Sequence, residues 1–199
     1  MNGLVVFILF CVFQMVNAQN NPKTFIKSDS AKFYFDLERK ELNLAKRIEL
    51  IDKAIEIEKE NFFLHNEKAN IYNENKEYKE YENYLKKMLV LFPSKGEADA
   101  QMGFYEEGLG NRKQADKYFE SSIKKINDGL KTEKNYQLVA SLNFLKMLNL
   151  LFLDRKKEVQ EIIDNTKEKD AQEFLSNYFQ GMKEMSRDKL YQFIKTDLK

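Results

Sequence analysis

Apolar and small side chains recur at intervals of three and four residues through the stretch 62–92, and polar residues separate them. This spacing is that of amphipathic helices, not of strands. The positions that carry the pattern are Ala69, Tyr72, Tyr81, Leu85 and Met88. Pro93 directly follows the stretch and cannot continue a helix. The pattern therefore predicts a helix–turn–helix pair that ends before Pro93.

The same pattern returns thirty-four residues later. Ala69 is matched by Gly103, and three positions of the second predicted helix have counterparts at Ala115, Phe119 and Ser122. One period earlier, Ile51 and Ala54 match Leu85 and Met88. A fixed period of this length is typical of stacked helical repeats, in which each pair buries its apolar face against its neighbours. We expect three such units before residue 127.

Beyond Ile126 the period slips, because Val159 and Ile163 echo Ala115 and Phe119 forty-four residues later. We expect the ten extra residues to lie in one long apolar helix, about 134–153, packed between neighbouring units. A last pair, about 170–185 and 186–198, would close the stack with Ser186 as N-cap. A polar outer face suited to solvating the end of the stack is expected there. It comprises Arg187, Asp188, Lys189, Lys195, Asp197 and Lys199.

The composition agrees with an all-α fold of four helical pairs plus a C-terminal capping pair. The chain has only 7 glycines and 2 prolines, and few residues that break helices favour helix throughout. Its 43% hydrophobic and 13% aromatic content predicts a folded chain. Lys plus Arg number 33 against 32 Asp plus Glu. This near balance disfavours nucleic acid and anionic membrane surfaces as partners.

The repeat resembles the tetratricopeptide repeat (TPR) family, of an exported bacterial type. The family pattern places a small residue where the two helices cross, as at Ala69 and Gly103, and an aromatic one turn later, as at Tyr72. His65 and Glu106 depart from the pattern, since both stand where the family usually has an aromatic side chain. The resemblance implies an α-solenoid, and a protein that binds a protein or peptide partner in its concave groove without catalysis.

In the family, the first helix of each unit lines the groove. Carrying those positions over to this chain implies a partner-binding surface made of Lys32, Asp36, Arg39, Phe63, Asn66, Asn70, Asn73, Glu74, Ala100, Phe104 and Glu107. Asparagine side chains both donate and accept hydrogen bonds, so the row of three asparagines could bind an extended peptide backbone. An exposed polar face is the plainer alternative, and both stay open.

The first residues predict an export signal. Residues 4–13 are apolar, and Val16 and Ala18 provide the small side chains that precede a cleavage site. We expect a signal peptide over 1–18, a flexible lead over 19–27 and the repeat domain over 28–199, in the periplasm or secreted. An uncleaved anchor is the first alternative. A lipoprotein modified at Cys11 is the second, disfavoured by bulky Phe10.

The residue types give little scope for catalysis. The chain has one histidine, His65, and one cysteine, Cys11, so nucleophile–base pairs and zinc sites built on these types are not expected. We expect His65 to pack at a helix crossing and expect no metal or cofactor. The leading hypothesis is a non-catalytic binding scaffold of the bacterial envelope. A purely structural subunit that uses its convex face and terminal helices is the main alternative, and hydrolysis by an unrecognised carboxylate pair is the third.

Overall fold

The computed structural model describes residues 25–196, with side chains to residue 194. The predicted signal peptide, most of the predicted lead, and Asp197 and Lys199 lie outside the described residues. Within residues 25–196 every regular element is a helix. These are α2 (Asp29–Glu38), α3 (Leu44–Ile57), α4 (Phe62–Glu74), α5 (Tyr78–Leu91), α6 (Gly96–Gly108), α7 (Arg112–Leu130), α8 (Tyr136–Phe152), α9 (Lys156–Asn165), α10 (Lys169–Met182) and α11 (Arg187–Thr196).

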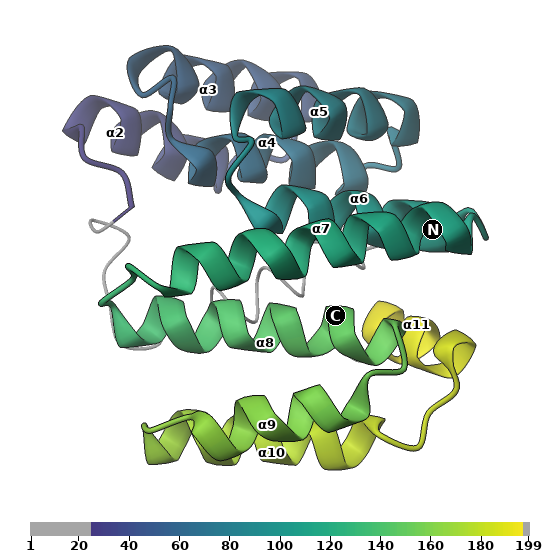
Figure 1. The fold of residues 1–199 in the computed structure, drawn as a ribbon. Coiled ribbons are helices and arrows are strands. Elements are labelled where there is room, and N and C mark those ends of the chain that lie inside the picture. Colours follow the sequence, from purple (N-terminus) through teal and green to yellow (C-terminus); the bar gives the residue numbers. More distant parts are fainter. Residues whose placement is uncertain (1–24, 197–199) are drawn as a thin grey trace.

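The helices form successive pairs joined by short turns, and the pairs stack on one another in chain order (Figure 1). The pair α2/α3 lies at one end of the stack, and α9 and α10 lie at the other. Four pairs and a terminal pair match the number and order that the sequence predicts. The prediction of an all-α helical repeat array is therefore confirmed.

Small residues allow close packing within the α4/α5 and α6/α7 pairs. The side chain of Ala69 is fully buried, and Gly103 of α6 packs directly on the ring of Phe119 from α7. At Gly96, a Cβ atom would lie 2.6 Å from the backbone oxygen of Ser122. The helices α6 and α7 thus approach so closely that neither glycine has room for a side chain.

The turn inside each of three pairs repeats with the same backbone geometry. Lys76, Gly110 and Asp154 all have positive φ, at 64°, 80° and 56°. In each turn the following amide donates to a carbonyl five residues back, as in Glu77 N to Tyr72 O at 2.9 Å. This is a Schellman-type helix end. The spacings between the three residues are the thirty-four and forty-four residues of the sequence pattern, so the turns repeat with the helices.

Side chains also fix where helices begin. The Asn61 carboxamide oxygen accepts from Phe63 N at 3.0 Å, and Asn43 and Asn135 cap α3 and α8 in the same way. The predicted N-cap Ser186 accepts from Lys189 N at 3.4 Å. Such caps satisfy amides that have no partner within their own helix.

The expectation that one long helix contains all ten extra residues is wrong. The helix α8 has 17 residues where α6 has 13, but α7 also has 19 where α5 has 14. The connection over 131–135 is one residue longer than that over 92–95. The additional length therefore divides between α7 and α8, which pack along each other. Two neighbouring helices can lengthen together because each covers the apolar surface that the other adds.

Candidate functional site

Three asparagines of α4 that belong to the predicted groove lie on one helical face. Asn66, Asn70 and Asn73 are three or four residues apart and are all buried. The alternative of an exposed polar face is therefore wrong. Two predicted neighbours are more accessible, since Glu74 is exposed and Phe63 is partly buried. The Phe63 ring packs against Phe35 of α2, with 5.2 Å between ring centroids.

Several carboxamide atoms on this face have no hydrogen-bond partner. The Gln101 side chain of α6 donates through Nε2 to Asn66 Oδ1. Asn70 Oδ1, Asn73 Nδ2 and Gln101 Oε1 are buried and unpartnered. A buried polar atom without a partner costs about 1–3 kcal/mol, so native proteins keep few of them. We call Asn66, Asn70, Asn73 and Gln101 the carboxamide row. Its unpartnered atoms are two oxygens, which can accept a hydrogen bond, and one nitrogen, which can donate one.

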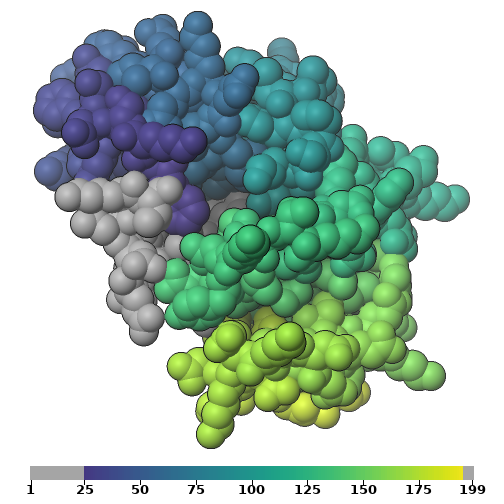
Figure 2. Space-filling view, turned by 60° about the vertical axis from the view of Figure 1, so that its left-hand side comes forward, coloured from purple at the N-terminus to yellow at the C-terminus, as the bar shows by residue number. Residues whose placement is uncertain are grey.

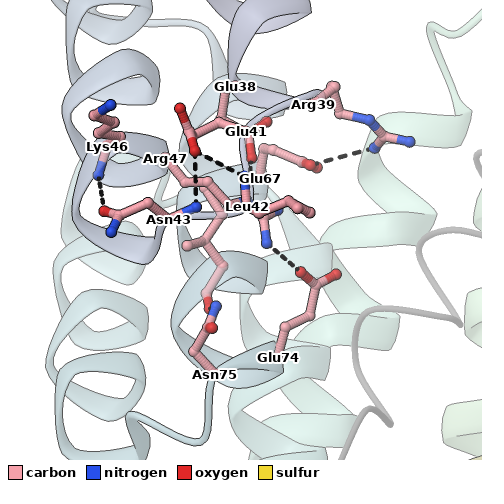
Figure 3. A network of polar contacts seen from close by, with 11 residues as sticks. Glu38, Arg39, Glu41, Leu42, Asn43, Lys46, Arg47, Glu67, Glu74 and Asn75 are labelled. Carbon is pink, nitrogen blue, oxygen red and sulfur yellow. Dashed lines mark hydrogen bonds and ion pairs between the residues drawn. The ribbon is translucent and has the colours of Figure 1, made fainter.

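An ionic cluster joins α2, α3 and α4 (Figure 3), and its member Glu67 directly follows Asn66 in the sequence of α4. Arg47 donates from Nε to Glu38 at 2.7 Å and from NH1 to Glu74 at 3.0 Å. Arg39 donates to Glu67 at 3.3 Å. Because three carboxylates share two guanidinium groups, the cluster carries excess negative charge when all five groups are ionised.

Burial controls the protonation of this cluster. Desolvation raises the pKa of Glu67 to about 7, the Glu38 charge adds to the rise, and Arg39 opposes it. Burial also raises the pKa of Glu38, against the hydrogen bond from Arg47. One carboxylate oxygen of Glu38, Oε2, is buried without a partner. A negative charge on a ligand would raise these pKa values further, whereas a positive charge would stabilise the ionised carboxylates, so the cluster is matched to a neutral or basic ligand.

The helix α2 supplies the remaining predicted groove residues of the first unit. Lys32 and Asp36 are partly buried, whereas Arg39 is exposed and forms its ion pair with Glu67. These three side chains follow one another at helical spacing along α2. The structure therefore brings the N-terminal half of the predicted groove together on α2 and α4.

The predicted groove residues of α6 have other surroundings. Ala100 and Phe104 are buried in the hydrophobic core, where Phe104 contacts the rings of Phe119 and Phe152 at 5.1 and 5.4 Å. Glu107 binds Arg187 from the chain's own helix α11. Residues of the α6, α7 and α8 packing and of α11 therefore cover this part of the predicted groove.

A cleft of about 1530 Å³ lies at the ends where α4 and α6 begin. Aromatic and aliphatic side chains line it together with charged residues of both signs. Its lining includes Phe25, Ile57, Phe62, Phe63, Gly96, Glu97, Lys125, Leu138 and Leu142. Burial raises the pKa of Glu97 in this lining. Phe63 belongs both to the cleft lining and to the predicted groove, whereas the carboxamide row is not part of this lining. Figure 2 shows one face of the molecule with the first pairs above α7.

Sequence reasoning missed four members of this site, namely Glu38, Glu67, Gln101 and Arg47. Gln101 lies thirty-four residues after Glu67, so the repeat period relates the two positions and could have identified Gln101. The contacts of Glu38 and Arg47 depend on how α2 packs on α3, and the sequence of the first unit carries the repeat pattern only faintly.

His65 is a buried packing residue, as expected. Its Nε2 donates to the Lys59 carbonyl at 2.9 Å, because a carbonyl can only accept. Its Nδ1 then accepts from the Tyr84 hydroxyl, also at 2.9 Å. Burial lowers the pKa of the imidazole. The ring is therefore a neutral bridge between α4, α5 and the preceding turn.

No protein-family model, characterised protein or solved structure matches this chain. Among residues 25–196, no helix is both long and apolar enough to cross a bilayer. In the same part of the chain, no group of three or more histidine, cysteine or acidic side chains is placed to hold a metal ion.

Proposed function

We propose that this chain is a non-catalytic, TPR-like module that binds an extended segment of another polypeptide on the concave face of α2 and α4. The carboxamide row carries the proposal. Three of its buried polar atoms have no partner, and a ligand that supplies those partners would recover their desolvation cost.

An extended peptide matches the chemistry of the row. Every non-proline residue of a peptide offers one N–H donor and one C=O acceptor. Asn70 Oδ1 and Gln101 Oε1 would accept from peptide N–H groups, and Asn73 Nδ2 would donate to a peptide carbonyl. Because these contacts involve backbone groups, they favour an extended conformation over any particular side chain.

The neighbouring groups narrow the class of peptide. The cluster has three carboxyl groups against two arginines, and a positive charge on the ligand would favour the ionised form of Glu67, so we propose a neutral or basic segment. The cleft beside Phe63 offers an apolar lining for a bulky side chain of the same segment. We propose that the partner is a protein of the bacterial envelope or a secreted protein, in keeping with the export signal expected at 1–18.

The repeated crossings and turns support the TPR-like assignment. Small residues at 69 and 103 and positive φ at Lys76, Gly110 and Asp154 recur with the sequence period. A stack built from equal units curves in one direction, which gives it a continuous inner face.

A structural subunit is the second candidate function, and one observation favours it. The outer side of the first pair exposes Phe33 by 58% and Leu42 by 97%. A terminal repeat normally presents polar residues to water, so this apolar end could pack against another subunit. In that case the groove would have no binding role.

Site-specific photo-crosslinking in the native host separates the two candidates. A benzoylphenylalanine in place of Glu74 reports on the groove. One in place of Val90, which is 79% exposed on α5, reports on the outer helices. The proposed function predicts a discrete crosslinked protein from position 74 that disappears in an Asn70→Leu background. Crosslinks from position 90 alone, or from position 74 regardless of Asn70, would contradict it.

A further inference from the structure

We propose that α11 is a built-in occupant of a surface formed by α6, α7 and α8, which an amphipathic helix of the partner displaces by bringing its own arginine to Glu107 and Asp116. The proposal rests on the proposed function and adds the chemistry of a second segment of the partner. The displacing helix has an arginine followed by aliphatic residues three and seven positions later, as α11 has.

Arg187 is the anchor of α11. Its Nε donates to Glu107 Oε1 at 2.9 Å, and NH2 donates to the other oxygen of the same carboxylate. NH1 donates to Asp116 at 2.7 Å, and the guanidinium lies 5.9 Å from the centroid of the Phe152 ring. A bidentate pair of this kind fits arginine and not lysine, because only guanidinium has the planar fork. Arg187 therefore binds inward, and the expectation that it belongs to a polar outer face at the end of the stack was wrong.

The binding site requires a cation. The Glu107 side chain is only 3% exposed, so its charge depends on a partner for stabilisation. Arg112 lies 3.7 Å from Glu107, but it is half-exposed and also binds Asp188 of α11. A partner that removes α11 without supplying a positive charge would leave Glu107 poorly compensated. A competing segment therefore needs an arginine of its own.

Two aliphatic side chains complete the contact. Leu190 and Ile194 lie three and seven residues after Arg187, on the same face of α11, and both are buried. Charged residues occupy the other face, where Asp188 and Lys189 are exposed. An arginine and two aliphatic residues at this spacing form the pattern of a helix that docks in a groove.

The fit of α11 is incomplete. Burial raises the pKa of Tyr191 to about 12, with a contribution from the Glu107 charge. Tyr191 in turn adds to the raised pKa of Tyr81, whose hydroxyl is buried without a partner. A helix that places a hydrogen-bonding group beside Tyr81 would improve on α11. The Tyr81 hydroxyl is therefore a group that a competing helix could satisfy and α11 does not.

A labelled peptide with the sequence of residues 186–199 tests the proposal on the full chain. Arg187→Ala loosens α11 in the protein, so we expect this variant to bind the peptide at least tenfold more tightly than the wild type. The same peptide with alanine at position 187 should bind at least tenfold more weakly to the variant. Lys189→Ala in the protein is the matched control and should behave as wild type. Equal affinity of wild type and Arg187→Ala would overturn the proposal.

Hydrogen exchange distinguishes displacement of α11 from unfolding of the whole protein. Saturating peptide should remove amide protection from residues 187–196 of the protein while α4 to α7 keep theirs. If the Arg187→Ala variant lost amide protection in all its helices without peptide, α11 would be a required part of the fold, and the proposal would be overturned. A concentration-dependent dimer that exchanges α11 between copies would also overturn it, in favour of a second copy as occupant. Asn70→Leu should leave peptide binding unchanged, which separates this test from that of the proposed function.

Discussion

A Cβ atom on Gly103 would lie 2.6 Å from Cε1 of Phe119. This distance is shorter than any ordinary contact between carbon atoms, so the ring of Phe119 occupies the space that a side chain at 103 would need. The two residues come from the two helices of one pair. Their contact sets how closely α6 and α7 approach, and thereby the repeat of the stack.

Replacing Gly103 by alanine should therefore destabilise the protein. Alanine favours helix by about 1 kcal/mol over glycine, but overpacking a filled core costs about 1–3 kcal/mol. Because the clash involves a ring held on several sides, we expect Gly103→Ala to lower the free energy of unfolding by about 1–2 kcal/mol in urea titrations.

Gly181 of α10 provides the matched control, since a Cβ there would meet nothing within 4 Å. Gly181→Ala should raise the free energy of unfolding by about 0.5–1 kcal/mol through helix propensity alone. Equal effects of the two substitutions would show that the crossing at 103 is not tight.

The sequence predicted these crossings because the repeat marks them directly. Small residues recur at 69 and 103, and a large apolar side chain follows at a fixed distance, so the pattern itself contains the packing. The repeated turns could have been predicted from the period, which Lys76, Gly110 and Asp154 share with the helices. Residue type gave no such signal, because lysine and aspartate do not mark a position of positive φ as glycine does.

The position of α11 could not be predicted in the same way. Arg187 and Glu107 are eighty residues apart, and no repeat relates them. Polar residues near a chain end normally solvate the last helix, so composition indicated the opposite role for Arg187. The ionic cluster was missed for the same reason, because its carboxylates come from helices whose relative packing decides which charges meet.

Asn70→Leu should separate stability from binding. Asn70 is buried and its Oδ1 has no partner, whereas leucine has the same number of side-chain heavy atoms and no polar atom to desolvate. We expect the substitution to raise the free energy of unfolding by about 1 kcal/mol while partner binding falls. Thermal unfolding checks the first part. A marked loss of stability would mean that the asparagine is held by contacts within the fold and is not reserved for a ligand.

Glu67→Gln should change stability in a pH-dependent manner. The folded pKa of Glu67 is about 7 and its ordinary value is 4.5, so the folded chain binds more protons than the unfolded chain between these values. Glu67 therefore makes stability fall as pH rises from about 4.5 to 7. Glutamine carries no charge to desolvate. At pH 8 the variant should be more stable than wild type by about 1–3 kcal/mol, and at pH 4.5 nearly equal.

Urea titrations at both pH values measure this difference. Glu49→Gln is a suitable control, because Glu49 is exposed and pairs with Lys53 on its own helix. A variant at 67 that is less stable than wild type at pH 8 would show that the Arg39 ion pair outweighs the burial of the charge.

His65 should act in the opposite direction. Burial lowers its pKa below the ordinary value of 6.5, so the unfolded chain binds a proton more readily than the folded chain. Stability should fall as pH drops below about 6.5, until the folded imidazole is protonated as well. His65→Phe removes this dependence. Subtracting the pH profile of the variant from that of the wild type isolates the contribution of His65, and a difference that is flat between pH 7 and 5 would contradict the prediction.

The affinity of the crosslinked partner segment for purified protein tests the central claim most directly. Isothermal titration would compare wild type, Asn70→Leu, Asn73→Ala and a Val90→Lys control on the outer face. We expect Asn70→Leu and Asn73→Ala each to weaken binding about tenfold, since each removes one hydrogen bond to a buried ligand group, and Val90→Lys to leave the Kd unchanged. Unchanged affinity in both asparagine variants, or a loss of affinity only in Val90→Lys, would contradict a partner-binding role for the concave face of α2 and α4.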